Sequence, residues 1–336
     1  MVGDVPAVSS RLEWTDYWGS LKVRFEIGRM KYTVDPGLYA VGQPDRESPV
    51  IVTGNYKLTF DSVRQALAKR DAWLLVLDTK GVNVWCAAGK GVFGTDELVA
   101  RINSVKLPKV VFHRKLILPQ LSGPGIAGYV VKQLTGFRVI YGPVEARDIP
   151  AFLDNGLRAT PEMRTKEFPV AERAVLIPVE VIQSMKYFLP VAAIYFLVNG
   201  LAHMADFWNY SIAGAEFSFL AGIGAVIGGA VITPLLLPWL PGRSFSVKGL
   251  VAGILTFVAL IAGSSIILRH QLNFLQLLAS LLLICSGSSF IGANFTGSST
   301  FTSLSGVKKE MRIAAPLQIV VATLSLCAWI SSGFIF

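Results

Sequence analysis

Cysteine is scarce in this chain. There are only three in 336 residues, Cys86, Cys285 and Cys327, and the last two lie inside apolar stretches. Three are too few for the paired disulfides of a small secreted scaffold or for the four thiolates of an iron–sulfur cluster. The three histidines are too dispersed to form a zinc site. Any electrons that the protein uses must therefore come from another protein.

Charge is the second shortage. Charged residues make up 16% of the chain and hydrophobic residues 52%, a balance too apolar for one ordinary soluble domain. The shortage lies in residues 186–336, which contain only 7 of the 31 Lys and Arg residues and 3 of the 22 Asp and Glu residues. The net charge of +9 is modest for this length, so nucleic-acid binding is not indicated. Part of the chain is predicted to lie in lipid.

The apolar half predicts a multi-pass membrane domain. Five stretches have the length of membrane spans, at residues 185–202, 217–240, 249–268, 272–293 and 313–336. Lys and Arg gather in alternate loops, as at Lys186, Lys248 and Lys308. This bias predicts an inner-membrane protein with its amino-terminal half in the cytoplasm and its carboxyl terminus outside. The start of the chain lacks the basic and apolar regions of a secretory signal, which agrees with that orientation. The glycine-rich run 222–229 favours close helix packing over a pore.

The polar half shows short β-rich runs that alternate with amphipathic segments. Strands are predicted within 48–55, 73–78, 109–118 and 137–142, and helices within 60–70, 95–104 and 126–136, while 83–86 is either extended or the opening of a helix. Thr95 is predicted to cap the second helix. The alternation predicts an α/β fold with a Rossmann-like parallel sheet covered on both faces. The predicted organisation is an N-terminal extension packed on the domain (1–48), the α/β domain (49–165), a linker (166–184) and an all-α, five-helix transmembrane domain (185–336).

In such a sheet a ligand binds at the carboxyl ends of the strands. Three loops are therefore predicted to form one site, at residues 53–57, 81–94 and 119–125. The second contains Gly89, Gly91 and Gly94 in the G-x-G-x-x-G spacing of a dinucleotide site. An NAD site needs an acidic residue about 20 positions later, where this chain reads KVVFHRK. A membrane-anchored NADP-binding protein, in which Arg114 would bind the phosphate group of NADP, stays open as an alternative.

Cys86 is the chemically distinctive residue of these loops. An unpaired cysteine near a sheet is most often a small buried apolar residue. Here two alanines and a glycine follow it, which leaves space above the sulfur, and Lys90 favours a thiolate. His113, the only histidine of the polar half, lies in a predicted strand and is more typical of a structural residue, or of a contact to the polar rim of a cofactor, than of a general base. A soft thiolate over small residues suits a large planar metal cofactor that needs one axial ligand.

The segment around this cysteine also resembles a known family. Residues Asn83 to Lys90, NVWCAAGK, resemble at every position the cap-helix signature of the HgcA family, the membrane corrinoid proteins of microbial mercury methylation. Further segments of likeness lie at 36–42, 49–61, 73–81 and 113–125. A more distant likeness is to the large subunit of the corrinoid iron–sulfur protein of the acetyl-CoA pathway. That family has a related Ala-Gly-Lys loop without this cysteine and carries its own cluster.

The resemblance implies a cobalamin-type corrinoid, bound base-off, with the Cys86 thiolate as the lower axial ligand of its cobalt. Cys86 is then both the catalytic and the metal-binding residue. Asn83 and Lys90 would steady the short cap helix by hydrogen bonds, and the small residues after Cys86 would let the backbone approach the corrin. The implied cofactor contacts are Asn83, Val84, Trp85, Cys86, Ala87, Ala88, Gly89 and Lys90, with Thr53 and Asn55 at the amide rim of the corrin.

The activity implied by the resemblance is a corrinoid-dependent methyl transfer to Hg(II), which produces methylmercury. A methyltransferase or methyl-tetrahydrofolate would supply the methyl group. A ferredoxin-like protein with 4Fe–4S clusters would be the reductant. The same residues also suit a membrane-tethered corrinoid methyl carrier of one-carbon metabolism without a mercury substrate.

Overall fold

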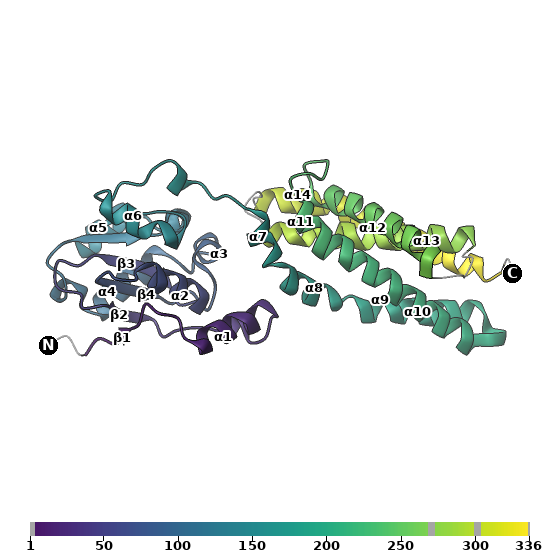
Figure 1. Ribbon diagram of the computed structural model, residues 1–336, viewed down its shortest axis with the longest axis horizontal. Helices are drawn as coiled ribbons and strands as arrows, with labels where there is room; N and C mark the ends of the chain where they lie inside the picture. The colour runs from purple at the N-terminus through teal and green to yellow at the C-terminus, as the bar shows by residue number, and fades with distance from the viewer. Residues whose placement is uncertain (1–3, 268–272, 299–303, 335–336) are drawn as a thin grey trace. The chain divides into compact units, whose positions relative to one another are not determined.

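The structure, a computed structural model, describes residues 4–267, 273–298 and 304–334. The chain divides into two compact units, Met1–Glu167 and Phe168–Phe336 (Figure 1). The first unit is built around a β-sheet and the second consists of helices. The mixed α/β domain followed by apolar helices agrees with the predicted order of fold classes.

The described part of the first unit contains a six-stranded sheet of order β1-β2-β4-β3-β5-β6. Its strands are β1 (Ala7–Val8), β2 (Gly37–Val41), β3 (Val50–Gly54), β4 (Ala72–Leu77), β5 (Lys115–Leu118) and β6 (Arg138–Tyr141). Strands β4, β3, β5 and β6 run parallel, as predicted. Strand β2 runs antiparallel to β4, with Gly37 opposite Val76, so the sheet is mixed. The first 48 residues thus add two strands to one edge of the sheet.

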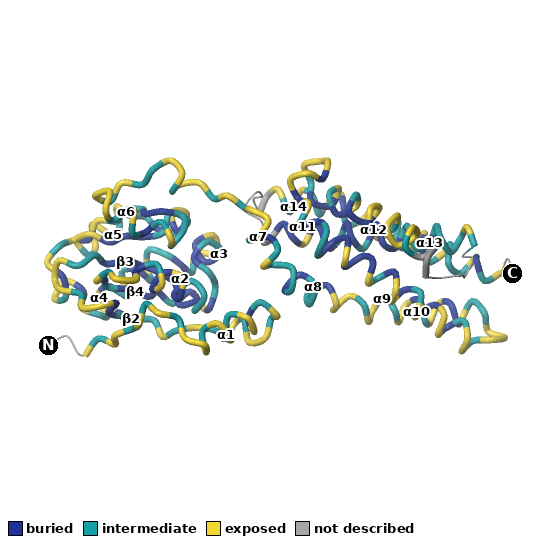
Figure 2. Tube along the Cα trace, viewed as in Figure 1, coloured by how far each residue is buried: buried dark blue, intermediate teal, exposed yellow. Residues whose placement is uncertain are grey.

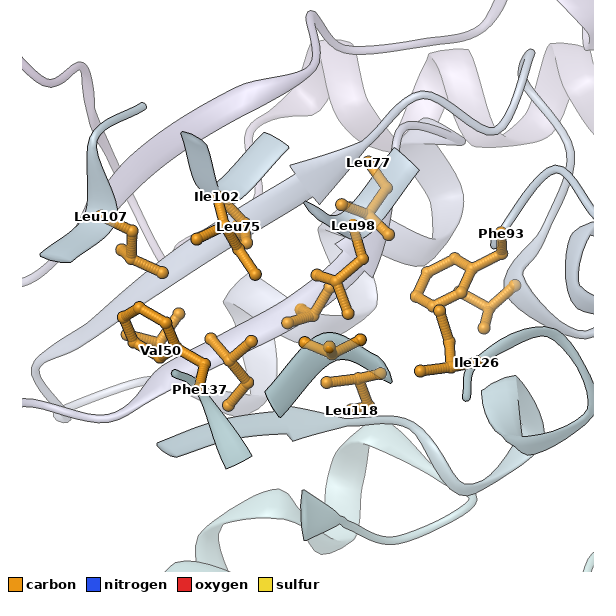
Figure 3. Packing of buried hydrophobic residues seen from close by; sticks show 14 of the residues in the cluster. Val50, Leu75, Leu77, Phe93, Leu98, Ile102, Leu107, Leu118, Ile126 and Phe137 are labelled. Carbon is orange, nitrogen blue, oxygen red and sulfur yellow. The ribbon is translucent and has the colours of Figure 1, made fainter. Parts of the chain in front are cut away.

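Helices cover both faces of the sheet, because the central strands are apolar on both sides. The helices are α1 (Trp14–Arg24), α2 (Lys57–Ala66), α3 (Val84–Gly89), α4 (Thr95–Ser104), α5 (Gly128–Thr135) and α6 (Ile149–Asp154). On one face, Leu75 of β4 packs in a buried cluster with Leu98 of α4 and Phe137 (Figure 3). On the other face, Phe60 of α2 and Phe152 of α6 belong to a second buried cluster. These two clusters hold the strand ends in fixed positions.

Two local predictions are wrong in detail. Gly94, and not Thr95, occupies the cap position of α4, because the Thr95 hydroxyl instead accepts a hydrogen bond from the Ala127 backbone N–H (2.8 Å). The predicted strand 109–118 begins only at Lys115. Its first part is a turn, since Lys106 has a left-handed φ of 50° and a 3-10 turn containing Pro108 follows.

The second unit is formed by α7 (Val170–Ala174), α8 (Ile177–Met185), α9 (Phe188–Ala202), α10 (Phe207–Val226), α11 (Thr233–Leu236), α12 (Phe245–Ile267), α13 (Phe274–Asn294) and α14 (Leu304–Ser332). Within the described residues, five helical stretches are long and apolar enough to cross a membrane, at Val170–Ala202, Met204–Leu236, Phe245–Gly263, Phe274–Asn294 and Gly306–Ser332. The predicted number is confirmed. The first two begin earlier than predicted, because helix continues into the more polar residues that precede each apolar run.

Parts of three predicted spans, at 268, 272 and 335–336, lie outside the described residues. The helices of this unit pack closely through small residues, as the glycine run 222–229 predicted. A Cβ on Gly229 would lie 2.5 Å from the Cβ of Ile291 in α13. A Cβ on Gly292 of α13 would lie 2.9 Å from the Cα of Gly249 in α12. Glycine is required at these points because the helix backbones approach one another too closely for a side chain.

Candidate functional site

The loop between β4 and α3 is held by Asn55, which follows β3. The Asn55 side-chain oxygen accepts hydrogen bonds from the Thr79 N–H (3.0 Å), the Thr79 hydroxyl (2.8 Å) and the Gly81 N–H (3.1 Å). Its amide nitrogen donates to Asp78 (3.2 Å). A hydrogen bond from Lys80 lowers the pKa of Asp78, which keeps this acceptor ionised. Asn55 therefore fixes the start of the cap-helix segment, and its predicted contact with a cofactor stays a prediction.

Asn83 begins α3 as its N-cap. Its side-chain oxygen accepts a hydrogen bond from the Cys86 backbone N–H at 2.9 Å, which satisfies one of the free donors of the first helical turn. This contact resolves the alternatives for residues 83–86 in favour of a helix opening. It also ties the backbone of Cys86 directly to the residue that was predicted to steady it.

The side chains of α3 divide between two faces. Val84, Ala87 and Ala88 are buried in the cluster that also contains Phe93. Cys86 is half-buried and unpaired on the other face. Helical spacing explains the division, because positions three and four apart share a face. Ala87 and Ala88 face the domain interior and pack the helix, and their predicted contact with a cofactor stays a prediction.

The outward face of α3 carries open space next to the sulfur. Gly89 lies three residues after Cys86 on this face, and a Cβ built on it would meet no atom within 4 Å. Gly89 and Lys90 are both exposed. The cysteine side chain is therefore next to a bare stretch of backbone that a flat ligand can approach.

The third predicted loop, residues 119–125, packs against the buried side of α3. It forms a 3-10 helix, Gln120–Gly125. A Cβ on Gly125 would lie 3.1 Å from the Cα of Ala88, so the two backbones are in close contact. Small residues on both segments allow this approach, which is a second structural reason for the alanines after Cys86.

A cavity of about 750 Å³ opens at the carboxyl ends of the parallel strands. All three predicted loops contribute to its wall, through Thr53, Trp85 and Pro119 among others. Asn83 and Val84 also line it. Cys86, Asn55 and Lys90 are absent from the lining, so the cavity borders the first turn of α3 and the sulfur lies beyond its edge.

Thr53 contributes a polar group with no hydrogen-bond partner among the described residues to the wall of this cavity. Its side chain is fully buried, and among the described residues its hydroxyl has no hydrogen-bond partner. An unsatisfied buried hydroxyl costs roughly 1–3 kcal/mol unless a ligand or water completes it. The cavity therefore contains a point at which a polar ligand group would be stabilised.

Sequence reasoning missed the part of the cavity that follows β6. Residues Pro143 to Arg147 line it, and Glu145 there pairs with Lys166 (2.7 Å) and Arg147 (2.6 Å). The rule that placed the other loops at the strand ends also applies to β6, which ends at Tyr141. Applied to all four parallel strands, it would have found this segment.

The dinucleotide alternative is not supported by the geometry. The glycines of a dinucleotide fingerprint form the loop that joins a strand directly to a helix. Here α3 follows β4 and ends at Gly89, so the glycines lie at the end of a helix and after it. Arg114 lies before β5, at the opposite end of the sheet from the cavity. Its guanidinium donates to the Val111 carbonyl (2.9 Å) and lies 5.2 Å from the Phe137 ring centroid.

His113 has a structural role, as predicted, although not in a strand. The Lys115 N–H donates to its Nδ1 (3.2 Å), so Nε2 carries the proton and donates to the Ser48 carbonyl (2.9 Å). Among the described residues, no group of three or more His, Cys, Asp or Glu side chains is placed to hold a metal ion.

Comparisons with known proteins cover the α/β unit. Residues 23–153 match the family described as the CO dehydrogenase/acetyl-CoA synthase delta subunit. The acetyl-CoA decarbonylase/synthase complex subunit gamma of Methanopyrus kandleri is 37% identical over 126 residues, 36% of this chain and 26% of the relative. The subunit gamma of Methanothermobacter thermautotrophicus is 36% identical over 128 residues, 38% of this chain and 28% of the relative. The subunit gamma of Archaeoglobus fulgidus is 31% identical over 140 residues, which are 40% of this chain and 29% of the relative.

The chain thus spans less than a third of the length of these relatives. The family match ends before the second unit begins. The names of the relatives concern acetyl-CoA metabolism and not mercury, and they agree with the more distant of the two likenesses found in the sequence.

Proposed function

We propose that the first unit binds a corrinoid over the outward face of α3, with the Cys86 sulfur as a cobalt ligand, and that the chain is a membrane-bound corrinoid methyltransferase. The placement of Cys86 carries this proposal. Its sulfur is unpaired and half-buried on a short helix whose next outward position is a bare glycine. Cobalt accepts a soft thiolate ligand.

The residues present fit a large cofactor with a polar rim. The cavity beside α3 ends in the unsatisfied hydroxyl of Thr53, and a corrinoid carries amide groups around its ring that suit such a partner. The helix that bears the sulfur is anchored by Val84, Ala87 and Ala88 in the core. A ligand atom held on a packed helix keeps its position better than one on a loop.

A bound corrinoid would supply a cobalt ion that carries a methyl group between a donor and an acceptor. The chain itself contributes the electron-rich sulfur and the contacts that hold it. Asn83 fixes the backbone of Cys86, and Asn55 fixes the loop before Asn83, so ligand orientation is set by two successive hydrogen-bonded asparagines. Lys90 lies one turn beyond Cys86 and is exposed, and we propose that it steadies the cap helix by a hydrogen bond.

The acceptor that we propose is Hg(II), with methylmercury as the product. This choice depends on the eight-residue likeness around Cys86 and on a donor sulfur, which suits delivery of the methyl group to an electrophilic metal ion. We also propose a ferredoxin-like reductant with 4Fe–4S clusters, a folate-type methyl donor, and a cytoplasmic location for the first unit.

A second candidate is a corrinoid methyl carrier of one-carbon metabolism. The comparisons favour this candidate more directly than mercury methylation, because the relatives are named as subunits of an acetyl-CoA decarbonylase/synthase complex. Protein partners from such a complex would then replace Hg(II) as acceptor. The two candidates share the corrinoid site and differ only in where the methyl group goes.

The test uses the purified full chain reconstituted with methylated corrinoid. Cys86→Ala should lose the visible absorbance band of sulfur-ligated cobalt and all formation of methylmercury from Hg(II), while Cys86→His should retain corrinoid and lose activity. The matched control is Cys327→Ala, an exposed cysteine of the second unit, which should behave as wild type. Identical spectra for wild type and Cys86→Ala would refute the ligand. Wild-type spectra without any methylmercury would instead favour the second candidate.

A further inference from the structure

Helix α1, near the start of the first unit, has an unusual environment. It begins after Glu13, where the Asp16 side chain accepts a hydrogen bond from the Glu13 N–H (2.9 Å), and it ends at Arg24. In a soluble domain such a helix normally turns its apolar stripe toward the core and its charges toward water. On α1 the large aromatic side chains point outward, and Val23 is its one buried residue.

The inner face of α1 carries Asp16, Gly19 and the buried Val23. Asp16 pairs with Lys57 (2.5 Å) and Arg64 (2.6 Å), both on α2. Gly19 lies against Tyr32, since a Cβ there would be 2.7 Å from the tyrosine ring. These contacts fix which face of the helix points inward, so the orientation does not depend on apolar packing alone.

The outer face of α1 is aromatic and exposed. Its side chains are Trp14, Tyr17, Trp18, Leu21 and Phe25, with exposed fractions between 43% and 79%. At 3.6 residues per turn these positions fall on one stripe. A contiguous exposed stripe of this kind marks a binding surface.

Basic residues flank the stripe on both edges. By helical position Lys22 lies on one edge and Arg24 on the other, and the Lys22 ammonium lies 5.8 Å from the Trp18 ring centroid. Tryptophan and tyrosine concentrate at membrane–water interfaces because their rings are both apolar and polar. An apolar stripe with aromatic residues between two basic edges is the pattern of a helix that lies in a lipid interface.

We propose that α1 docks on the surface of the bilayer, with its aromatic stripe in the lipid interface and its basic edges at the headgroups. The occupant is lipid, because the basic edges match phosphate headgroups. The described residues also include five helices able to cross a membrane, so a bilayer is a surface that this chain can meet. Docking adds a second attachment of the α/β unit to the membrane, independent of the chemistry at Cys86.

The test measures the depth of single spin labels on the full chain in vesicles that contain phosphatidylglycerol. The three native cysteines are replaced by alanine, and a label is placed at Leu21→Cys on the stripe or at Gln133→Cys on α5 as the water control. The Leu21 label should lie about 5–10 Å below the headgroup level, with high exposure to oxygen and low exposure to a water-soluble nickel reagent. The Gln133 label should show the reverse.

Two results would overturn the proposal. A Leu21 label as accessible to nickel as the Gln133 label would place the stripe in water, and a label shielded from both reagents would show that protein covers it. The double variant Trp14→Ser, Trp18→Ser provides a second check. These exposed side chains are not needed for the inner contacts, so the variant should fold and should bring the Leu21 label into water. An unchanged depth in that variant would also contradict lipid docking.

Discussion

Both units contain buried and exposed residues (Figure 2), but the second unit buries more small polar side chains than the first. In the first unit the fully buried residues are mainly apolar, as at Leu75 and Phe137, and they form clusters on both faces of the sheet. In the second unit serines such as Ser211 and Ser288 are fully buried, whereas Leu189 and Ile319 are largely exposed. Water drives apolar groups inward in the first unit. Lipid offers no such force, and the small and polar residues at helix contacts of the second unit are typical of helices that pack in a membrane.

Helix α1 belongs to the first unit by its contacts and resembles the second by its outward side chains. We infer that the kind of residue that faces outward indicates the local solvent more directly than it indicates the fold class.

The largest expected effect is the loss of a buried aromatic ring from the first unit. Phe137→Ala should destabilise that unit by about 3–5 kcal/mol, because it leaves a cavity in a packed core. Leu324→Ala, at an outward position of α14, should change stability by about 0.5 kcal/mol or less. Urea unfolding of the full chain in nanodiscs, followed by hydrogen exchange in each unit, measures both values. Equal losses at the two sites would contradict the difference between the units.

A moderate effect is expected from a single methyl group at a helix contact of the second unit. Gly249→Ala places a Cβ against the backbone of Ser288 and Ser289 in α13. Overpacking of this kind costs about 1–3 kcal/mol. The matched control is Gly263→Ala on the same helix, where a Cβ would meet no atom within 4 Å. Thermal unfolding in detergent should show a loss for the first variant only.

The last effect appears only in acid and concerns the ion pairs that attach α1 to α2. Burial alone would raise the pKa of Asp16, but hydrogen bonds led by that from Lys57 outweigh it and lower the pKa from 3.8 to about 2. Ionised Asp16 therefore stabilises the first unit above about pH 4, and this contribution, on the order of 2 kcal/mol, is lost as the pH falls from about 4 to about 2.

The measurement for Asp16 is the unfolding free energy of the first unit across that pH range. Asp16→Asn should remove most of the pH dependence, whereas Asp154→Asn, in an exposed pair with Arg70, should change it little. Retention of the full acid transition in Asp16→Asn would assign it to another carboxylate.

Several features of the fold and the site follow from the sequence because they depend on near neighbours. The apolar runs that form β3 and β4, the helix that ends at Gly136 and the five long apolar stretches are all set by local periodicity. Cys86 could also be predicted as the candidate ligand from the residues next to it in the sequence. The convergence of three loops was predicted from a topological rule, and the cavity contains residues of all three.

Other features required contacts between distant segments. The residues next to Thr95 in the sequence could not show that its hydroxyl accepts a hydrogen bond from the Ala127 N–H and does not cap its own helix. Nor could it show that Asn55 is occupied in holding the Thr79 loop. A short polar side chain has several partners within reach, and the chain path decides among them.

The sequence alone determined that this chain has an α/β unit with one distinctive cysteine and a separate apolar unit, because composition and periodicity act over a few residues. Only the tertiary structure decided that β2 pairs antiparallel with β4, that the alanines after Cys86 face inward, and that α1 turns its aromatic side chains outward. Each of these depends on which distant segment occupies the neighbouring space, and side-chain volume and ion pairing settle that choice only when the whole unit is assembled.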